Sequence, residues 1–588
     1  MEQHLAQYAL VAVIAVLTIV VVATFSKKLG VAAPLILVVV GIVASYLPGM
    51  PSDFSVPSEV ILVGLLPPLL YSAAISVPLV DFRRNLNSIS ALSVLLVVGT
   101  AFGTGAILYL IFPDLNFAAA VALGAVISPT DAVAATSIGK RLGLPPRLVT
   151  ILEGESLVND ATALVLLRSA LAATAAAVSF WGVVGDFAFA VVVAIAIGLV
   201  IGVITVFVRS KLRDSVLDTA ISFVTPFLAF VPAEELGASG VLAVVVAGLY
   251  CGHASAKRIT PQARISERIN WHTVQFIIEN GVFLLMGLQI SGIIQSVNEK
   301  PDQFPVWVAI LLGLLMTAVV IVIRFVFVGP LLLWLRRNTE LRHRQNQRFA
   351  AALDRIRLST VRLTERQRRR QTRAVDSLNR RELDVKRMRA EGLGWRGGLL
   401  LSWSGMRGVV TLAAAQSLPQ DLPYRAQLIL IAFTVAIVTL LAQGSTLPWL
   451  IKASGIRGTD STADHRELAT LLDEMSEAGV EALSAPELSL PGGEPLDPLV
   501  VDRVRSDTLL SAEAAWERAE QGSGIDALAA SPHQQYRSLR REVLRAERAR
   551  LLEARSKGAY PSRILERAQA MLDLEETRLE QADGAGGR

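Results

Sequence analysis

The chain has 588 residues, 52% of them hydrophobic, and its mean hydropathy of +0.50 excludes an ordinary soluble protein of this length. The formal net charge is only +5, and the single cysteine, Cys251, excludes both a disulfide framework and a cysteine-based metal site. The first apolar run follows an acidic residue, Glu2, rather than a basic cluster, which favours a retained helix over a cleaved signal peptide.

Apolar stretches long enough to cross a bilayer, roughly 17–25 residues each, recur over most of the chain. They predict an all-α polytopic membrane domain over residues 1–455 with about thirteen transmembrane helices. The predicted helices lie near residues 8–26, 31–48, 59–80, 88–112, 117–138, 149–175, 181–208, 215–232, 237–253, 274–296, 305–335, 397–418 and 426–452.

The short loops between these helices carry an uneven distribution of basic residues. If the N-terminus lies outside, only Lys300 and Arg425 fall in outer loops. Cytoplasmic loops are normally the basic ones, so this pattern predicts an outer N-terminus and a cytoplasmic C-terminus. The predicted inner residues are Lys27, Lys28, Arg83, Arg84, Lys140, Arg141, Arg147, Arg209, Lys211, Arg213, Lys257, Arg258, Arg264 and Arg268.

Two longer segments carry further charge. The insert at 336–396 is strongly basic, which is compatible either with a solvated helix pair or with contact to anionic lipid headgroups; nucleic-acid binding is not expected on a membrane protein. The tail at 456–588 is acidic, and residues 534–581 have the pattern of one or two amphipathic helices. It contains no GxGxxG or Walker motif, so we expect a cytoplasmic helical tail for regulation or self-association.

An acidic motif lies in the sixth predicted span. A carboxylate in hydrocarbon costs at least roughly 3 kcal/mol and persists only when it is paired, protonated or bound to a cation. At 1.5 Å per residue, Asp160 lies roughly 17 Å into this span, close to the bilayer centre. Ser156 is its i, i+4 neighbour on the same side, and Asn159 lies beside them. Glu155 points to a different side of the helix.

The fifth predicted span contains Ser128-Pro129-Thr130-Asp131. Proline has no N–H and disrupts the helix before it, so backbone carbonyls near Thr130 lack helical partners. Broken helices at membrane depth are tolerated where they line a polar cavity. The twelfth span contains Gly405 and Gly408, which permit unwinding there too.

Two arginines lie at membrane depth, Arg324 in the eleventh span and Arg407 in the twelfth. Such arginines stay charged and need carboxylates. Structural ion pairing explains Glu155, Arg324 and Arg407, but two arginines cannot neutralise Asp131, Glu155 and Asp160 together. One carboxylate, which we assign to Asp160, is left to take H⁺ or a metal cation.

With thirteen spans, helices 1–6 and 8–13 form two halves of opposite orientation, in which the broken helices 5 and 12 correspond. Inverted repeats with crossing, broken helices are typical of secondary transporters. The symmetry rests on position alone, because the two halves show no obvious sequence similarity.

Three motifs, SPTDAVA, EGESLVNDATALV and GMRGVVTLAAA, resemble those of the monovalent cation:proton antiporter-1 family, which includes NhaP-type antiporters and sodium/proton exchangers. The resemblance covers about residues 8–452. It implies thirteen helices, a homodimer in the cell membrane, and a core domain that moves against a dimerisation domain.

The same resemblance implies roles for individual residues. Asp160, Asp131, Ser156 and the Thr130 backbone match the family's Na⁺ ligands, and Asn159 with Asp160 matches the Asn-Asp pair of its electroneutral branch. The implied structural residues are Glu155 and Arg324, as an ion pair, and Arg407 on the crossing helix.

Together these features predict a secondary Na⁺/H⁺ antiporter, and neither an enzyme nor a cofactor-dependent protein. One Na⁺ or one H⁺ occupies Asp160 in turn, which couples the two fluxes and supports pH homeostasis. The alternatives are a K⁺(Na⁺)/H⁺ antiporter of the same fold, a cation channel, and a membrane sensor that transports nothing. A repeated carbonyl filter is missing from the sequence, which disfavours a channel.

Overall fold

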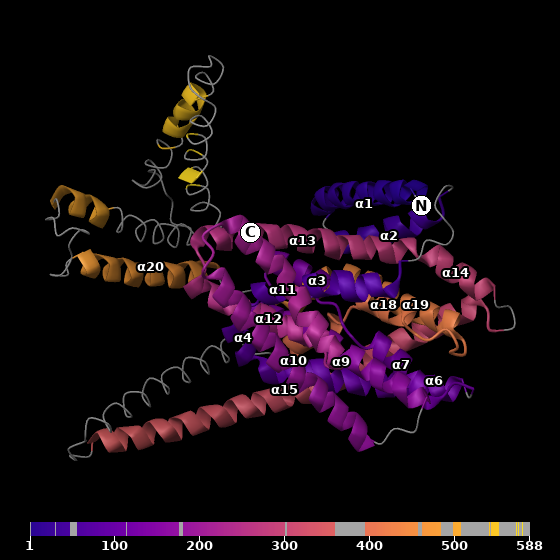
Figure 1. The fold of residues 1–588 in the computed structure, drawn as a ribbon. Helices are drawn as coiled ribbons and strands as arrows, with labels where there is room; N and C mark the ends of the chain where they lie inside the picture. The colour runs from indigo at the N-terminus through magenta and orange to yellow at the C-terminus, as the bar shows by residue number, and fades with distance from the viewer. Residues whose placement is uncertain are drawn as a thin grey trace. The chain divides into compact units, whose positions relative to one another are not determined.

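The computed structural model consists of helices, and the described residues include no strand (Figure 1). These residues are 2–29, 31–47, 56–112, 114–175, 180–299, 303–358, 394–456, 461–483, 498–506, 540 and 542–551, with single positions 568, 572, 574, 575 and 579. The chain forms two compact units, Met1–Ile456 and Arg457–Arg588.

The helices of the first unit follow the apolar stretches of the sequence. Two segments, η1 and η2, are π-helical. In chain order the helices are α1 (Glu2–Leu29), α2 (Ala33–Ser45), η1 (Val60–Leu65), α3 (Leu66–Ser76), α4 (Leu79–Arg84), α5 (Leu86–Ser90), η2 (Ala91–Leu96), α6 (Val97–Ile111), α7 (Phe117–Ile127), α8 (Val133–Arg141), α9 (Pro146–Ala175), α10 (Phe180–Arg209), α11 (Ser215–Glu235), α12 (Gly240–Arg258), α13 (Pro261–Leu288), α14 (Ile290–Asn298), α15 (Val306–Leu358), α17 (Trp395–Trp403), α18 (Val409–Gln416) and α19 (Arg425–Ser454).

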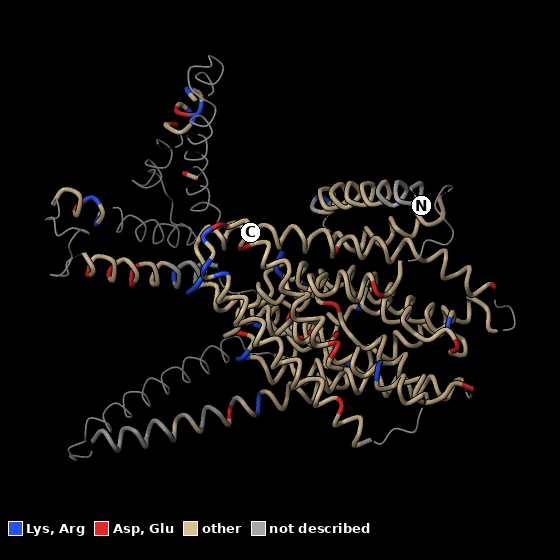
Figure 2. The backbone as a smooth tube through the Cα atoms, in the orientation of Figure 1, with Lys and Arg blue, Asp and Glu red and all other residues tan. Residues whose placement is uncertain are grey.

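Every predicted span has a helical counterpart, so the predicted all-α polytopic architecture is confirmed. Among the described residues, seven helices are long and apolar enough to cross a bilayer, and five apolar helices are shorter. The span predicted at 397–418 is divided between α17 and α18, which are shorter again. Charged residues are sparse in the described interior of this unit (Figure 2).

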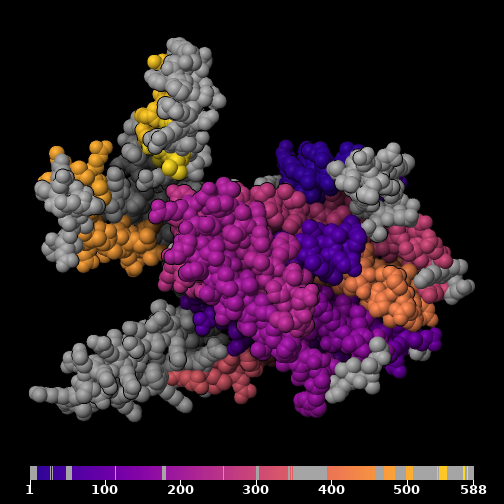
Figure 3. All heavy atoms as spheres, in the orientation of Figure 1, coloured from indigo at the N-terminus to yellow at the C-terminus, as the bar shows by residue number. Residues whose placement is uncertain are grey.

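The outer surface of the first unit is apolar where a lipid bilayer would cover it. Val192, Val200 and Phe207 of α10 are 65%, 56% and 58% exposed in the isolated chain. Helix α10 belongs to the magenta surface in Figure 3. Because exposed side chains of this size are unfavourable in water, this face is suited to contact with lipid or with another apolar surface.

Helix α9 lies between two hydrophobic cores. Ile151 and Leu152 pack in the larger core, to which α7, α15, α18 and α19 contribute. Leu157 and Ala161 pack in the second core, built mainly from α3, α10, α11 and α12. Helices α1, α2 and α13 pack against one another (Figure 1). The polar residues of α9 therefore lie where the two cores meet.

The two charged segments are described in part. Helix α15 continues to Leu358 and so includes the start of the basic insert, whereas 359–393 lies outside the described residues. The tail unit contains α20 (Ser461–Leu483) and helical segments at 498–506 and 542–551. Most of the helical stretch predicted at 534–581 lies outside the described residues. Arg540 forms an ion pair with Glu575 at 2.5 Å.

Candidate cation site at two broken helices

Both predicted helix breaks are present, and the two broken segments contact each other. Helix α7 ends at Ile127 and α8 begins at Val133, while α17 ends at Trp403 and α18 begins at Val409. The backbone N–H of Asp131 donates to the Met406 carbonyl at 2.7 Å. The contact between the two breaks thus provides hydrogen-bond partners for some of the backbone groups that lack a partner within their own helix.

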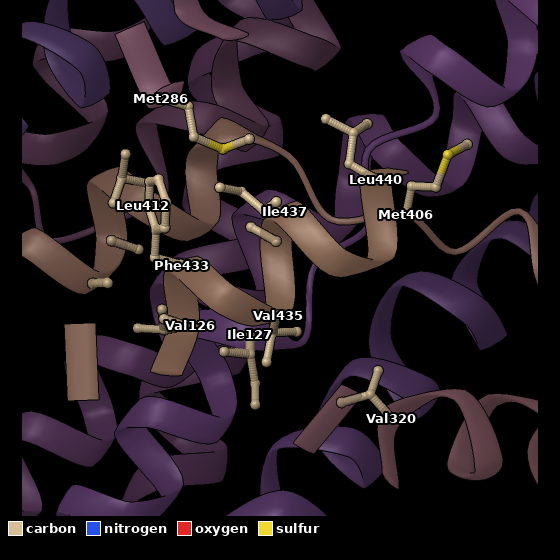
Figure 4. Close-up of a cluster of buried hydrophobic side chains, with 14 of the residues drawn as sticks. Val126, Ile127, Met286, Val320, Met406, Leu412, Phe433, Val435, Ile437 and Leu440 are labelled. Atoms are coloured by element: carbon tan, nitrogen blue, oxygen red, sulfur yellow. The ribbon is translucent and has the colours of Figure 1, made fainter. Parts of the chain in front are cut away.

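The crossing is packed tightly against apolar side chains. A methyl group added at Gly408 would lie 2.4 Å from Asp131 Oδ2, so a larger residue there would displace the Asp131 side chain. Figure 4 shows Ile127, at the end of α7, beside Val435 of α19. Helix α19 packs against both α7 and α18. This packing leaves the carboxylate of Asp131 a closely defined position.

Asp131 itself is held by the helix that follows it. Its Oδ1 accepts a hydrogen bond from the backbone N–H of Val133 at 2.7 Å. The N-terminus of a helix carries partial positive charge and unpaired N–H groups, and both stabilise a nearby carboxylate. Asp131 is therefore oriented by α8 rather than by a basic side chain.

Glu155 and Arg324 form the predicted ion pair. The guanidinium donates to both carboxylate oxygens, at 2.5 and 2.9 Å, and also to the carbonyl of Leu401. Thr130 donates its hydroxyl to Glu155 at 2.8 Å. Both charged side chains are almost fully buried. This pair joins α9, α15 and α17 and ties the first helix break to α9.

The sequence leads us to expect a carboxylate partner for Arg407, but the described residues provide none. Its guanidinium donates to the carbonyl of Ile127 at 3.1 Å and to that of Gly405. Its backbone N–H donates to the hydroxyl of Thr439. The carbonyls freed at the two helix breaks carry partial negative charge, and they take the place of an acidic side chain.

Asp160 and Asp131 are the two carboxylates of this cluster that lack a basic partner in the described part of the chain. Asp160 is 7% exposed, and none of the hydrogen bonds found for the described residues involves its carboxylate. Summed over three carboxylates and two arginines, the cluster carries one net negative charge when all are ionised. That sum agrees with the sequence argument, although it leaves two carboxylates rather than one without a basic neighbour.

Asn159 orders the backbone of the helix break. Its Nδ2 donates to the carbonyl and to the hydroxyl oxygen of Thr130, both at 2.9 Å. Its Oδ1 is buried and has no hydrogen-bond partner in the described part of the chain. Ser156, one turn before Asp160, accepts a long hydrogen bond from the Ala132 N–H at 3.4 Å.

A cavity of about 680 Å³ reaches this cluster. Four of the predicted site residues line it: Thr130, Asp131, Ser156 and Asp160. Glu155, Asn159, Arg324 and Arg407 are not among the residues that line it. The cavity extends to Lys140 and Arg141 at the end of α8, and to Glu153 of α9 and His272 of α13.

The four lining residues offer a carboxylate, a second carboxylate, a hydroxyl and a carbonyl. Such hard oxygen donors bind alkali and alkaline-earth cations in preference to softer metals. A carboxylate without a basic partner also accepts a proton when no cation is present. The arrangement can therefore hold either a small cation or a proton at one place.

Sequence reasoning missed a second buried charge cluster, formed by Arg209, Asp218 and Glu267. Arg209 had been counted as a loop residue, yet it is 1% exposed and binds Asp218 through two nitrogens at 2.9 and 2.7 Å. It also binds Glu267 at 2.7 Å. Ser222 connects Glu267 to the Trp271 indole. The sequence does show charged residues near the ends of α10, α11 and α13. Which of them pair depends on how the three helices pack together.

A polytopic helical protein with carboxylates at the crossing of two broken helices has the features of a secondary ion transporter. The model of the sodium/hydrogen exchanger transmembrane family matches residues 13–453, and the chain belongs to this family of cation/proton antiporters. It is an integral membrane protein, and a transporter rather than an enzyme.

Several known proteins are similar to the chain. An uncharacterised Na⁺/H⁺ exchanger of Mycobacterium tuberculosis is 29% identical over 97% of this chain and 96% of its own length. A sodium, potassium, lithium and rubidium/H⁺ antiporter of Bacillus subtilis is 29% identical over 74% of this chain and 61% of its own. The structure of the sodium proton antiporter MjNhaP1 from Methanocaldococcus jannaschii matches with a TM-score of 0.55 at 17% identity, covering 78% of this chain and all of that one. This last likeness concerns the fold.

Proposed function

We propose that this protein exchanges Na⁺ for H⁺, binding one or the other in turn at Asp160 and Asp131. The observation that carries the proposal is that these two carboxylates line the same cavity and have no basic partner among the described residues. Ser156 and the Thr130 carbonyl complete the Na⁺ ligands, together with water. Asn159 holds Thr130 in position.

The charge of the cluster supports a one-for-one, electroneutral cycle. Its single net negative charge is neutralised by one Na⁺ or by one proton. Asn159 adds no titratable group beside Asp160, so only one exchangeable proton accompanies each cation. Competition for one site couples the two fluxes without ATP.

Access to the site must alternate between the two sides. The cavity reaches the site from the helix ends that carry Lys140 and Arg141. Towards the opposite end of α9, Arg168 forms an ion pair with Glu234 of α11. We assign the open end to the cytoplasm, because the basic loops predict that orientation. Movement of the broken helices against the second core then opens the opposite path.

We further propose a homodimer in the cell membrane with its N-terminus outside, its tail in the cytoplasm and its basic insert against anionic lipid. Cys251 is 1% exposed, so an introduced cysteine can be labelled with little background. Lys211→Cys, at an exposed helix end, should react with an impermeant maleimide from the cytoplasmic side alone. Cross-linking of the reconstituted protein tests the dimer.

The decisive experiment is ion-driven proton movement in proteoliposomes, followed with a pH-sensitive dye and scanned over Li⁺, Na⁺ and K⁺. Asp160→Asn should abolish exchange and leave expression intact, because neutralising a buried carboxylate without a basic partner is not costly. Asp186→Asn is the matched control, since Asp186 is exposed on α10.

The scan also separates the alternatives. A response to K⁺ equal to that for Na⁺ identifies the broader cation/H⁺ antiporter, in line with the ions named for the Bacillus relative. A channel passes cation current with no obligatory proton countermovement. A sensor moves neither ion. Near wild-type exchange in Asp160→Asn would falsify the assignment of the site.

A further inference from the structure

Two buried oxygens on the cavity wall have no hydrogen-bond partner among the described residues. They are Oδ1 of Asn280 on α13 and Oγ1 of Thr411 on α18. Asn280 is 6% exposed and Thr411 is 1% exposed. Both residues line the cavity that reaches Asp131 and Asp160.

Unpartnered polar atoms of this kind are uncommon in folded proteins. Leaving a buried donor or acceptor unsatisfied costs roughly 1–3 kcal/mol, so such atoms usually have a ligand, a water or a functional role. The Asn280 side chain is otherwise fixed, because its Nδ2 donates to the Phe276 carbonyl at 2.8 Å. The Oδ1 atom of Asn280 therefore remains available to accept a ligand.

A carboxylate lines the same cavity. Glu279 precedes Asn280 on α13 and also lines the cavity. Its Oε1 accepts a hydrogen bond from Gln275 at 2.6 Å, one turn earlier. Helices α13 and α18 pack against each other, so the helix that carries Glu279 and Asn280 adjoins the helix that carries Thr411.

We propose that Asn280, Thr411 and Glu279 form a second, weaker site for a monovalent metal cation, occupied before the cation reaches Asp131 and Asp160. The inference rests on the proposed cation transport. Two neutral oxygens and one carboxylate are hard ligands, and cavity water completes the shell. A pathway needs intermediate sites that bind strongly enough to admit an ion and weakly enough to release it.

The first test is the Na⁺ dependence of exchange by the full chain in proteoliposomes. Thr411→Val and Asn280→Leu each remove the oxygen and keep the number of heavy side-chain atoms, although Asn280→Leu also removes the Nδ2 donor to Phe276. Each should raise the apparent KM for Na⁺ roughly tenfold, equivalent to ~1.4 kcal/mol, with the maximal rate retained. Thr411→Ser keeps the hydroxyl and should restore the wild-type KM. Thr225→Val is the matched control, because this buried hydroxyl already donates to a helix carbonyl outside the cavity.

The second test does not need transport. Purified Asp160→Asn protein is unfolded thermally in Na⁺ and in choline at equal ionic strength. The second site should still give a small Na⁺-dependent rise in Tm, since a ligand that binds the folded state stabilises it. Adding Thr411→Val or Asn280→Leu should abolish that rise.

The outcomes distinguish this inference from the function on which it rests. An unchanged KM in both oxygen-removing variants, or a fall in maximal rate alone, overturns the second site and indicates that water satisfies these oxygens. The absence of any Na⁺-specific rise in Tm for Asp160→Asn overturns it as well. Wild-type protein without Na⁺-driven proton movement instead refutes the antiport proposal, and the thermal measurement then decides the second site separately.

Discussion

Removing the carboxylate of Glu155 should destabilise the protein far more than neutralising Asp160. Glu155 accepts two hydrogen bonds from Arg324 and one from Thr130, all inside the membrane domain. Among the described residues, Glu155→Ala leaves the 1% exposed guanidinium with only the Leu401 carbonyl as partner. Truncating one member of a buried ion pair typically costs about 3–5 kcal/mol.

Asp160→Asn provides the comparison, because that carboxylate has no basic partner among the described residues. We expect the order of Tm values to be wild type, then Asp160→Asn close to it, and Glu155→Ala well below both. Intrinsic tryptophan fluorescence of the purified protein during heating measures this order. Large membrane proteins often unfold irreversibly, so all variants must be heated at one rate.

A double variant adds a test of the mechanism. Replacing both members of a buried pair by apolar residues is often nearly neutral. Glu155→Leu with Arg324→Met should therefore be more stable than Arg324→Met alone or Glu155→Leu alone. If Glu155→Ala and Asp160→Asn unfold at the same temperature, or if the double variant simply adds the two losses, the pair does not hold these helices as argued.

Three further predictions concern other parts of the site. Gly408→Ala should lower exchange by at least roughly tenfold, because its methyl would displace the Asp131 carboxylate, whereas Gly99→Ala meets open space and should be neutral in the same flux assay. Exchange should be insensitive to a valinomycin clamp at about −100 mV, because one net charge moved per cycle would change the driving force by about 2.3 kcal/mol; a several-fold shift in the supported Na⁺ gradient contradicts one-for-one exchange. Arg209→Met should lower the free energy of unfolding by about 3–5 kcal/mol, and with it Tm, because two buried carboxylates lose their ion-pair partner. A Tm equal to that of wild type would show that this cluster is not structural.

The sequence by itself determined the transmembrane architecture and the positions of the helix breaks. Span length and hydropathy are local properties, because a bilayer requires each segment to satisfy its own backbone. Pro129 and Gly408 mark the breaks for equally local reasons, since one removes a donor and the other leaves room for a close approach. The ion pair of Glu155 with Arg324 was also predictable once the family motifs were recognised.

The tertiary structure alone decided how the remaining charges are satisfied. Arg407 binds the carbonyl of Ile127, 280 positions away, because the two breaks cross in space. Its side chain was identifiable from the sequence, whereas the carbonyl that it meets has no sequence signal, since every residue carries one. Arg209 lies at the end of a predicted span, and its burial against Asp218 and Glu267 depends on how α10, α11 and α13 pack. The unpartnered oxygens of Asn280 and Thr411 share a cavity wall only because α13 and α18 pack together, which no local pattern specifies.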